Sequence, residues 1–290
     1  MKIKKRCASD RVFYFLVWFL IIFGFFITLL PFMYVISVSF SDIHAINRGQ
    51  VGIWPVGFNL DGYKQVLGQQ KLWRAYYNTL WYTVVGTVLN IVFTVIAAYP
   101  LSKKYLPNRR FWIFFIIFTM YFSGGMIPNY LLINNWLKLS NTIWALILPP
   151  AMSAYNLIIV RNFFESIPDS LEESARIDGA RETTVLFKIV VPLSMPVLAT
   201  VSLWCIVGHW NAWYDCMLYI RDDTKYVLQY TLQRILLDGQ VQDLDHIGTK
   251  VNTETMKMAS IVVSILPIMI IYPFVQKYFT KGVMIGAVKG

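Results

Sequence analysis

The sequence predicts an all-α integral membrane protein with six transmembrane helices, and three observations lead to this prediction. The mean hydropathy is +0.52, and only 14% of the 290 residues are charged, against about a quarter in soluble domains. Six stretches of 19 to 30 residues contain no Asp, Glu, Lys or Arg, and ~20 apolar residues suffice for a helix to cross a bilayer. None of these stretches alternates with a two-residue period, so helices are expected rather than the strands of a barrel.

The predicted spans follow these stretches and together form one transmembrane domain over residues 1–290. Buried helices of a large soluble protein are the alternative, but they would need amphipathic helices with charged faces, which the stretches lack. The spans are expected at approximately 12–40, 76–101, 111–133, 141–162, 192–214 and 258–277.

The first span is expected to be retained in the membrane. Its apolar stretch is about twice as long as that of a signal peptide, and no small-x-small cleavage site follows it. The basic residues in the segments between spans indicate on which side of the membrane each segment lies. The loop 102–110 (SKKYLPNRR) has four basic residues and the loop 129–140 has one. Lys and Arg collect on the cytoplasmic side, so both termini and the charged segment 161–188 are predicted to be cytoplasmic.

The two remaining loops, 42–75 and 215–257, are expected to be folded extracytoplasmic caps that are too short to be independent domains. Membrane topology accounts for the net charge of +10, so lipid is an expected partner and nucleic acid is not. Cys205 and Cys216 are expected on one helix, about 16 Å apart by helical rise, which is too far for a disulfide.

The interior of the spans contains no Asp, Glu, Lys or Arg, since Arg161 and Lys277 lie at span ends, and the one titratable candidate for such a role is His209 in the fifth. Carriers driven by ion gradients place charged residues inside their spans, so the energy for any transport should enter from elsewhere. Phosphate-loop, zinc-site and nucleophile-elbow motifs are also absent from the sequence. No catalytic site, metal or cofactor of its own is therefore expected.

The charged segment before the fifth span is predicted to form two short helices. Ser170 and Glu173 fit a capping box behind Pro168 and Asp169, and Gly179 is placed to end the first helix at positive φ. A second helix should run from about Arg181 to Pro192. Small side chains on the first helix would suit docking in a groove of another protein, and a connector lying on the bilayer is the alternative. The small residues are Ser174, Ala175 and Ala180.

This segment resembles a signature of ABC importer permeases. The run Glu173-Ser174-Ala175, three residues, Gly179, nine residues and Ile189-Val190-Val191-Pro192 is similar to their E-A-A-x3-G-x9-I-x-L-P loop, with Ser and Val as the two departures. The stretches 210–233 (WNAWYDCMLYIRDDTKYVLQYTLQ) and 282–290 (GVMIGAVKG) resemble carbohydrate-uptake permeases of the maltose-transporter type. Within that type, the chain is most similar to permeases for oligosaccharides and polysaccharide fragments in Gram-positive bacteria.

The resemblance implies a permease subunit in a bacterial cell membrane, with a coupling-helix loop at 165–191 between spans four and five. Its implied partners are a second permease subunit of different sequence, two ATPase subunits that bind ATP and Mg²⁺, an extracytoplasmic solute-binding protein and a carbohydrate. A carrier or membrane scaffold that works alone remains the alternative. The implied ATPase contact consists of Glu173, Ser174, Ala175, Arg176, Ile177, Asp178, Gly179 and Ala180.

A substrate path is expected where aromatic faces and amide groups lie inside the spans. For Trp213 and Tyr214 an interfacial aromatic belt is the alternative, and Asn156 and Trp204 could simply pack between helices. His209 is expected to be a hydrogen-bonded helix contact. The candidates for the path are Tyr155, Asn156, Trp204, Trp210 and Asn211.

In the tail 282–290 glycines recur at four-residue spacing among apolar residues, which suits close contact with another surface. The resemblance to the sugar-permease ending implies that this tail lies near the ATPase interface. A membrane-surface anchor through Lys281 and Lys289 is the alternative.

Overall fold

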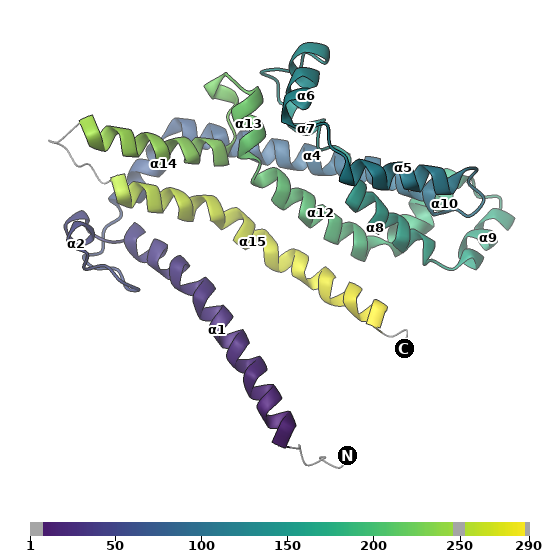
Figure 1. The fold of residues 1–290 in the computed structure, drawn as a ribbon, viewed down its shortest axis with the longest axis horizontal. Coiled ribbons are helices and arrows are strands. Elements are labelled where there is room, and N and C mark those ends of the chain that lie inside the picture. Colours follow the sequence, from purple (N-terminus) through teal and green to yellow (C-terminus); the bar gives the residue numbers. More distant parts are fainter. Residues whose placement is uncertain (1–7, 246–252, 288–290) are drawn as a thin grey trace. The chain divides into compact units, whose positions relative to one another are not determined.

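The computed structural model describes residues 8–245 and 253–287, and every regular element within these ranges is helical (Figure 1). The predicted all-α class is thus confirmed for the described residues. The chain divides into two compact units. Unit 1 comprises Met1–Gln69 and Ile235–Ile265, and unit 2 comprises Gln70–Arg234 and Leu266–Gly290.

Unit 1 begins with α1 (Ala8–Ser39), a helix whose apolar surface is open along most of its length. The chain after it folds into a compact loop with the short helices α2 (Ile43–Asn47) and α3 (Asp61–Gly68). The ring of Phe40 stacks on those of Phe58 and Tyr63, with centroids 5.6 and 4.8 Å apart. This loop therefore has a small core of its own, as expected for a folded cap.

Two further helices contribute to both units, namely α14 (Leu228–Asp245) and α15 (Thr253–Ala287). Within unit 1, α3 lies directly against the start of α15. A Cβ atom at Gly62 would be 2.9 Å from the backbone oxygen of Thr255, so the absence of a side chain allows this approach.

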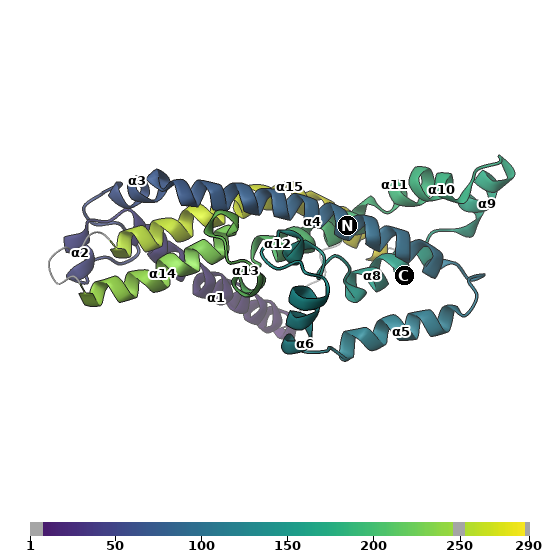
Figure 2. The ribbon, with the colours of Figure 1, turned by 90° about the horizontal axis from the view of Figure 1, so that it is seen from above.

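Unit 2 is built around α4 (Gln70–Ser102), which packs against α8 (Ala154–Glu165) and α12 (Met195–Trp210). Small or narrow residues recur on α4 at four-residue spacing and are buried, which lets the neighbouring helices come close. Farther along, the buried side chains form an apolar cluster with those of α8 and α12. In Figure 2, α9 and α10 lie at one end of this helix group and α13 lies toward the other. The four-residue series on α4 is Gly86, Asn90, Thr94 and Ala98.

Three of the six predicted spans are interrupted. Helix α5 (Arg109–Tyr121) is followed after a 106° bend by α6 (Met126–Leu131) and a π-helical turn to Trp136. Helix α7 (Trp144–Ile147) is separated from α8 by a non-helical segment that contains two consecutive prolines. Proline lacks the N–H that a helix needs, so a single continuous helix over the fourth span is wrong.

The fifth predicted span is also divided. The chain from α10 (Glu182–Val185) through a π-helical turn to α11 (Val191–Leu193) meets α12 at a bend of 80°. Helix α12 ends at Trp210, and α13 (Trp213–Tyr219) follows as a separate helix. Cys205 and Cys216 are therefore on different helices, contrary to the prediction, and both are buried free thiols.

Among the described residues, two helices are long and apolar enough to cross a membrane, or up to four segments if each bent pair forms one span. The exact count of six stays a prediction, as do the boundaries of the domain and of its loops.

The carboxamide of Asn90 joins α4 to α12 and to the break between α7 and α8. The Asn90 side-chain nitrogen donates to the carbonyl oxygen of Pro150, 2.6 Å away, and its oxygen accepts from Nε2 of His209 at 2.7 Å. The Pro150 carbonyl belongs to the break between α7 and α8, where no helical partner exists. In a membrane such a group must be bonded by other protein groups, and Asn90 does this.

We expect Asn90→Leu to lower the free energy of unfolding in detergent by about 1–3 kcal/mol, because Pro150 and His209 would lose their buried partner. Asn135→Leu is a matched control, since Asn135 is exposed. An equal loss in both variants would show that the Asn90 bonds contribute nothing beyond the change in polarity.

Candidate functional site

The charged segment that the sequence singled out contains helix α9 (Asp169–Ile177). Its start differs from the prediction. Pro168 occupies the position before the first turn, and no side chain caps that end. The predicted capping box is therefore wrong, because the helix begins at Asp169 and Ser170 is already inside the first turn. There the Ser170 carbonyl accepts a 2.9 Å hydrogen bond from the Ser174 hydroxyl.

The end of α9 agrees with the prediction. Gly179 has φ of +81°, a conformation in which a side chain would be strained. The N–H of Gly179 donates to the carbonyl of Arg176 at 3.0 Å, and that of Ala180 donates to the carbonyl of Ala175 at 2.9 Å. This pair of bonds is the Schellman arrangement that closes a helix. It turns the chain sharply into α10, which starts at Glu182 with Arg181 before it.

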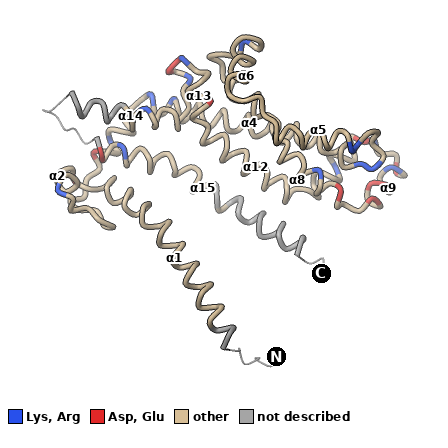
Figure 3. Tube along the Cα trace, viewed as in Figure 1, with Lys and Arg blue, Asp and Glu red and all other residues tan. Residues whose placement is uncertain are grey.

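Charged side chains gather around α9, while the middle of the α4–α8–α12 group is almost free of them (Figure 3). The central contact is an ion pair between Lys103, just after α4, and Glu172 on α9. Their side chains are only 10% and 8% exposed. The ammonium group of Lys103 also lies 4.5 Å from the centre of the Tyr99 ring. Because an unpaired charge would be costly in such a buried place, this pair fixes α9 against the end of α4.

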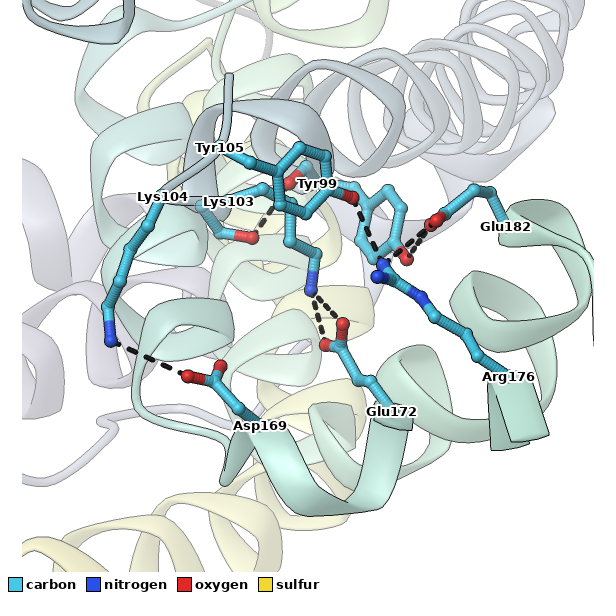
Figure 4. A network of polar contacts seen from close by, with 9 residues as sticks. Tyr99, Lys103, Lys104, Tyr105, Asp169, Glu172, Arg176 and Glu182 are labelled. Atoms are coloured by element: carbon cyan, nitrogen blue, oxygen red, sulfur yellow. Dashed lines mark hydrogen bonds and ion pairs between the residues drawn. The ribbon is translucent and has the colours of Figure 1, made fainter. Parts of the chain in front are cut away.

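A second set of contacts ties α9 to α10 (Figure 4). Arg176 lies 2.8 Å from a carboxylate oxygen of Glu182 and donates to the Tyr105 hydroxyl at 3.1 Å. The Tyr99 hydroxyl donates to the other Glu182 oxygen at 2.7 Å. The hydrogen bond to Tyr105 favours the charged guanidinium and raises the pKa of Arg176. Arg176 therefore stays charged and holds α9 against α10.

The end of α4 is held in the same region. The carbonyl oxygen of Leu101 accepts from Arg109 at 3.0 Å and from Arg161 at 3.2 Å. Both arginines also contact the carboxylate of Glu165, at 2.5 and 2.6 Å. These bonds bring the ends of α4 and α8 and the start of α5 together.

The outward side of α9 has no such contacts. Ile177 is 86% exposed, which is unusual for so large an apolar side chain beside a charged segment. Ala175 and Ala180 pack against the apolar cluster of unit 2, and Arg176 is engaged by Glu182. Of the eight residues that the resemblance assigned to an ATPase contact, five are exposed and have no side-chain bond to another described helix: Glu173, Ser174, Ile177, Asp178 and Gly179.

The residues on the inward side were missed from the sequence. In the sequence, Lys103 served only to indicate membrane topology. Nothing in the spacing of Glu172 indicates that it pairs with a lysine at the end of α4. Tyr99, Tyr105 and Glu182 were not singled out either, because their contacts join segments far apart in the chain.

Some of the predicted substrate-path residues line a cavity of about 260 Å³ within unit 2. Asn156 and Trp204 are among its lining residues, and the ring of Tyr155 lies 5.9 Å from that of Trp204. Trp210 is not part of the lining, because it is buried edge-to-face against Tyr76. Asn211 is exposed and donates to the carbonyl of Val207 at 3.0 Å.

Sequence reasoning missed four other polar lining residues, Tyr82, Asn90, Ser153 and Asp215. Asp215 lies one position beyond a charge-free stretch, so it was counted with the following loop. The bond between His209 and Asn90 agrees with the expected helix contact. Trp213 and Tyr214 are partly exposed and pack edge-to-face, 5.6 Å apart.

Residues 72–285 match the family of binding-protein-dependent transport system inner membrane components, and the chain belongs to this family of multi-pass membrane permeases. It is 40% identical over 287 residues to the polygalacturonan/rhamnogalacturonan transport system permease protein YtcP of Bacillus subtilis strain 168, covering 97% of this chain and all of that one. It is 44% identical over 267 residues to protein LplC of the same organism, covering 91% and 90%. The resemblance to carbohydrate ABC permeases is confirmed.

Solved structures give the same result. One chain of a bacterial ABC transporter involved in the import of the acidic polysaccharide alginate matches with a TM-score of 0.88 and 37% identity, over 96% of this chain and all of that chain. A chain of the bacterial alginate ABC transporter in complex with a periplasmic protein bound to alginate pentasaccharide shares the fold, with a TM-score of 0.58 and 15% identity over 92% and 93% of the two chains.

We expect Lys103→Glu to destabilise the chain by about 3–5 kcal/mol, because it leaves two carboxylates facing each other in a buried site. The double variant Lys103→Glu/Glu172→Lys should recover most of this loss. The free energy of unfolding and the rate of trypsin cleavage at Arg176 and Arg181 measure both effects.

Lys104→Glu is the matched control. It makes the same charge change at a side chain that is 75% exposed and 3.5 Å from Asp169, where an ion pair contributes roughly 0–1 kcal/mol. If the charge-swapped double variant is no more stable than Lys103→Glu, the pair does not act through its charges.

Proposed function

We propose that this chain is a transmembrane permease subunit of an ATP-driven importer that carries a carbohydrate, either an oligosaccharide or a polysaccharide fragment, into a bacterial cell. The proposal includes six spans, cytoplasmic termini and a plasma-membrane location. Membership of the permease family and the names of the relatives support it. The observation that carries the coupling mechanism is the two-sided character of α9, which is tied inward by Glu172 and Arg176 and open outward at Ile177.

The proposed partners are a second permease of different sequence, two ATPase subunits and an extracytoplasmic solute-binding protein. ATP and Mg²⁺ would be bound by the ATPases, and this chain would have no catalytic site or cofactor. No residue of α9 or α10 lines the cavity beside α12, so energy received at α9 must be passed to it mechanically.

Two routes for this motion follow from the contacts. A push on α9 reaches α4 directly through the Lys103–Glu172 ion pair, and α4 packs on both α8 and α12. The same push reaches α12 through α10 and the bend beside Ser194. Because interior packing is dense and resists compression, movement of α4 would alter the surroundings of the cavity.

A secondary carrier or scaffold working alone is the second candidate. Purification through a tag on this chain separates the two functions, because the importer must bring an ATPase with it. Uptake into proteoliposomes that depends on internal ATP and persists without an ion gradient would exclude the carrier. The proposed proximity of the tail to the ATPases concerns residues whose side chains are not described, and 288–290 lie outside the described residues.

We expect Gly179→Pro to abolish import while the chain still reaches the membrane. Proline cannot adopt the positive φ of this position and lacks the N–H that bonds Arg176, so the turn after α9 would be lost. Gly179→Asn is the control, since asparagine tolerates the left-handed conformation, and it should retain most of the import. Normal import by the proline variant would remove the coupling role of this turn.

We expect Ile177→Asp to weaken binding of the ATPase subunits by about 2 kcal/mol or more, as is typical for a central apolar contact. Ile177 is so exposed that the chain's own stability should change little. Co-purification of the ATPase and thermal unfolding of the chain are measured together. Retention of the ATPase at wild-type level would place the contact elsewhere.

A further inference from the structure

The wall of the cavity in unit 2 includes a carboxylate, that of Asp215, which forms no hydrogen bond or ion pair with the described part of the chain. The hydroxyl of Tyr82 is fully buried and has no hydrogen-bond partner among the described residues. Asp215 is half-buried and lines the same cavity. Buried polar groups in native proteins are nearly always hydrogen-bonded. The Tyr82 hydroxyl is covered by its neighbours and is not reached from the cavity, whereas the Asp215 carboxylate can accept hydrogen bonds from hydroxyl groups of a molecule inside it.

The remaining walls fit the same kind of molecule. Trp204 is 40% exposed and presents an aromatic surface beside the amide of Asn156. The volume of about 260 Å³ is near the lower limit of small-molecule pockets, which is about 300 Å³. An aromatic face, an amide and a carboxylate are suited to the C–H surface and the hydroxyl groups of a sugar ring. The size favours one sugar unit at a time.

The charge of the cavity limits which sugar unit can occupy it. None of its lining residues is Lys or Arg, and Asp215 forms no ion pair with any described residue. His209 is buried and already bonded to Asn90. A uronate would bring a second carboxylate next to Asp215, and like charges at a partly desolvated site oppose binding. A neutral unit has no such cost, and its hydroxyl groups can donate to Asp215.

We propose that this cavity is a subsite for a neutral sugar unit and that Asp215 selects against uronates. This inference rests on the proposed carbohydrate-importer function and adds a substrate preference to it. The preference is not evident from the relatives, because the matched permease is named for polygalacturonan and the matched transporter for alginate.

The test uses the complete complex, purified through a tag on this chain and placed in lipid nanodiscs. Equilibrium binding is measured for three pairs of trisaccharides that differ only in their carboxyl groups: galactotriose and trigalacturonate, mannotriose and trimannuronate, cellotriose and triglucuronate. At least one neutral member should bind, and it should bind at least about tenfold more tightly than its uronate counterpart. Asp215→Asn should reduce this ratio, and Asp215→Lys should shift it toward the uronate.

The matched control is Asp223→Asn, which removes one carboxylate outside the cavity, where Asp223 pairs with Lys71 on the surface. It should leave the ratio unchanged. The inference is overturned if no neutral trisaccharide binds, if a uronate binds as tightly as its neutral counterpart, or if both Asp215 variants keep the wild-type ratio. ATP hydrolysis by the same complexes is a separate measurement. A complex without any ATPase subunit would instead contradict the proposed function.

Discussion

The close packing of α4 against α8 and α12 is the interaction on which both candidate sites depend. Gly86 has no room for a side chain, because a Cβ atom there would be 2.7 Å from Nε2 of His209. This approach lets Asn90 reach both His209 and the carbonyl of Pro150. The cavity borders these same residues, so its walls include the break between α7 and α8, whose free carbonyl group Asn90 satisfies. A polar side chain inside an apolar group of helices thus has a structural role first.

The Lys103–Glu172 pair extends this packed group to α9. A buried ion pair does not by itself stabilise a fold, since desolvation offsets much of the attraction. The ion pair instead fixes the position of α9, because the two buried charges must stay together and α9 must therefore move with the end of α4. Arg176 and Glu182 add a second tie, so the short helix behaves as a part of the helix group although two turns are too few to be stable in isolation.

Local chemistry explains which features could be predicted. Gly179 was identified because a left-handed residue after a short helix is a local requirement, and the apolar stretches follow from the thickness of a bilayer. The predicted capping box was wrong because α9 starts at Asp169, directly after Pro168, so that Ser170 already lies within the first turn. The breaks around Pro150 and before α6 depend on which groups elsewhere satisfy the freed backbone. Lys103 and Glu172 were missed for the same reason, because only the folded chain brings them together.

The two long helices of the chain are under different chemical restrictions. Along α4 a single methyl group at Gly86 would collide with a neighbouring ring. Along α1, no side chain between residues 12 and 36 is buried within unit 1, so size and shape at these positions are not constrained by the interior of that unit. What remains is the requirement for apolar character that a bilayer imposes. Homologous chains should therefore vary freely among Leu, Ile, Val and Phe in this helix, and any position there that resists such exchange would reveal a contact made outside unit 1.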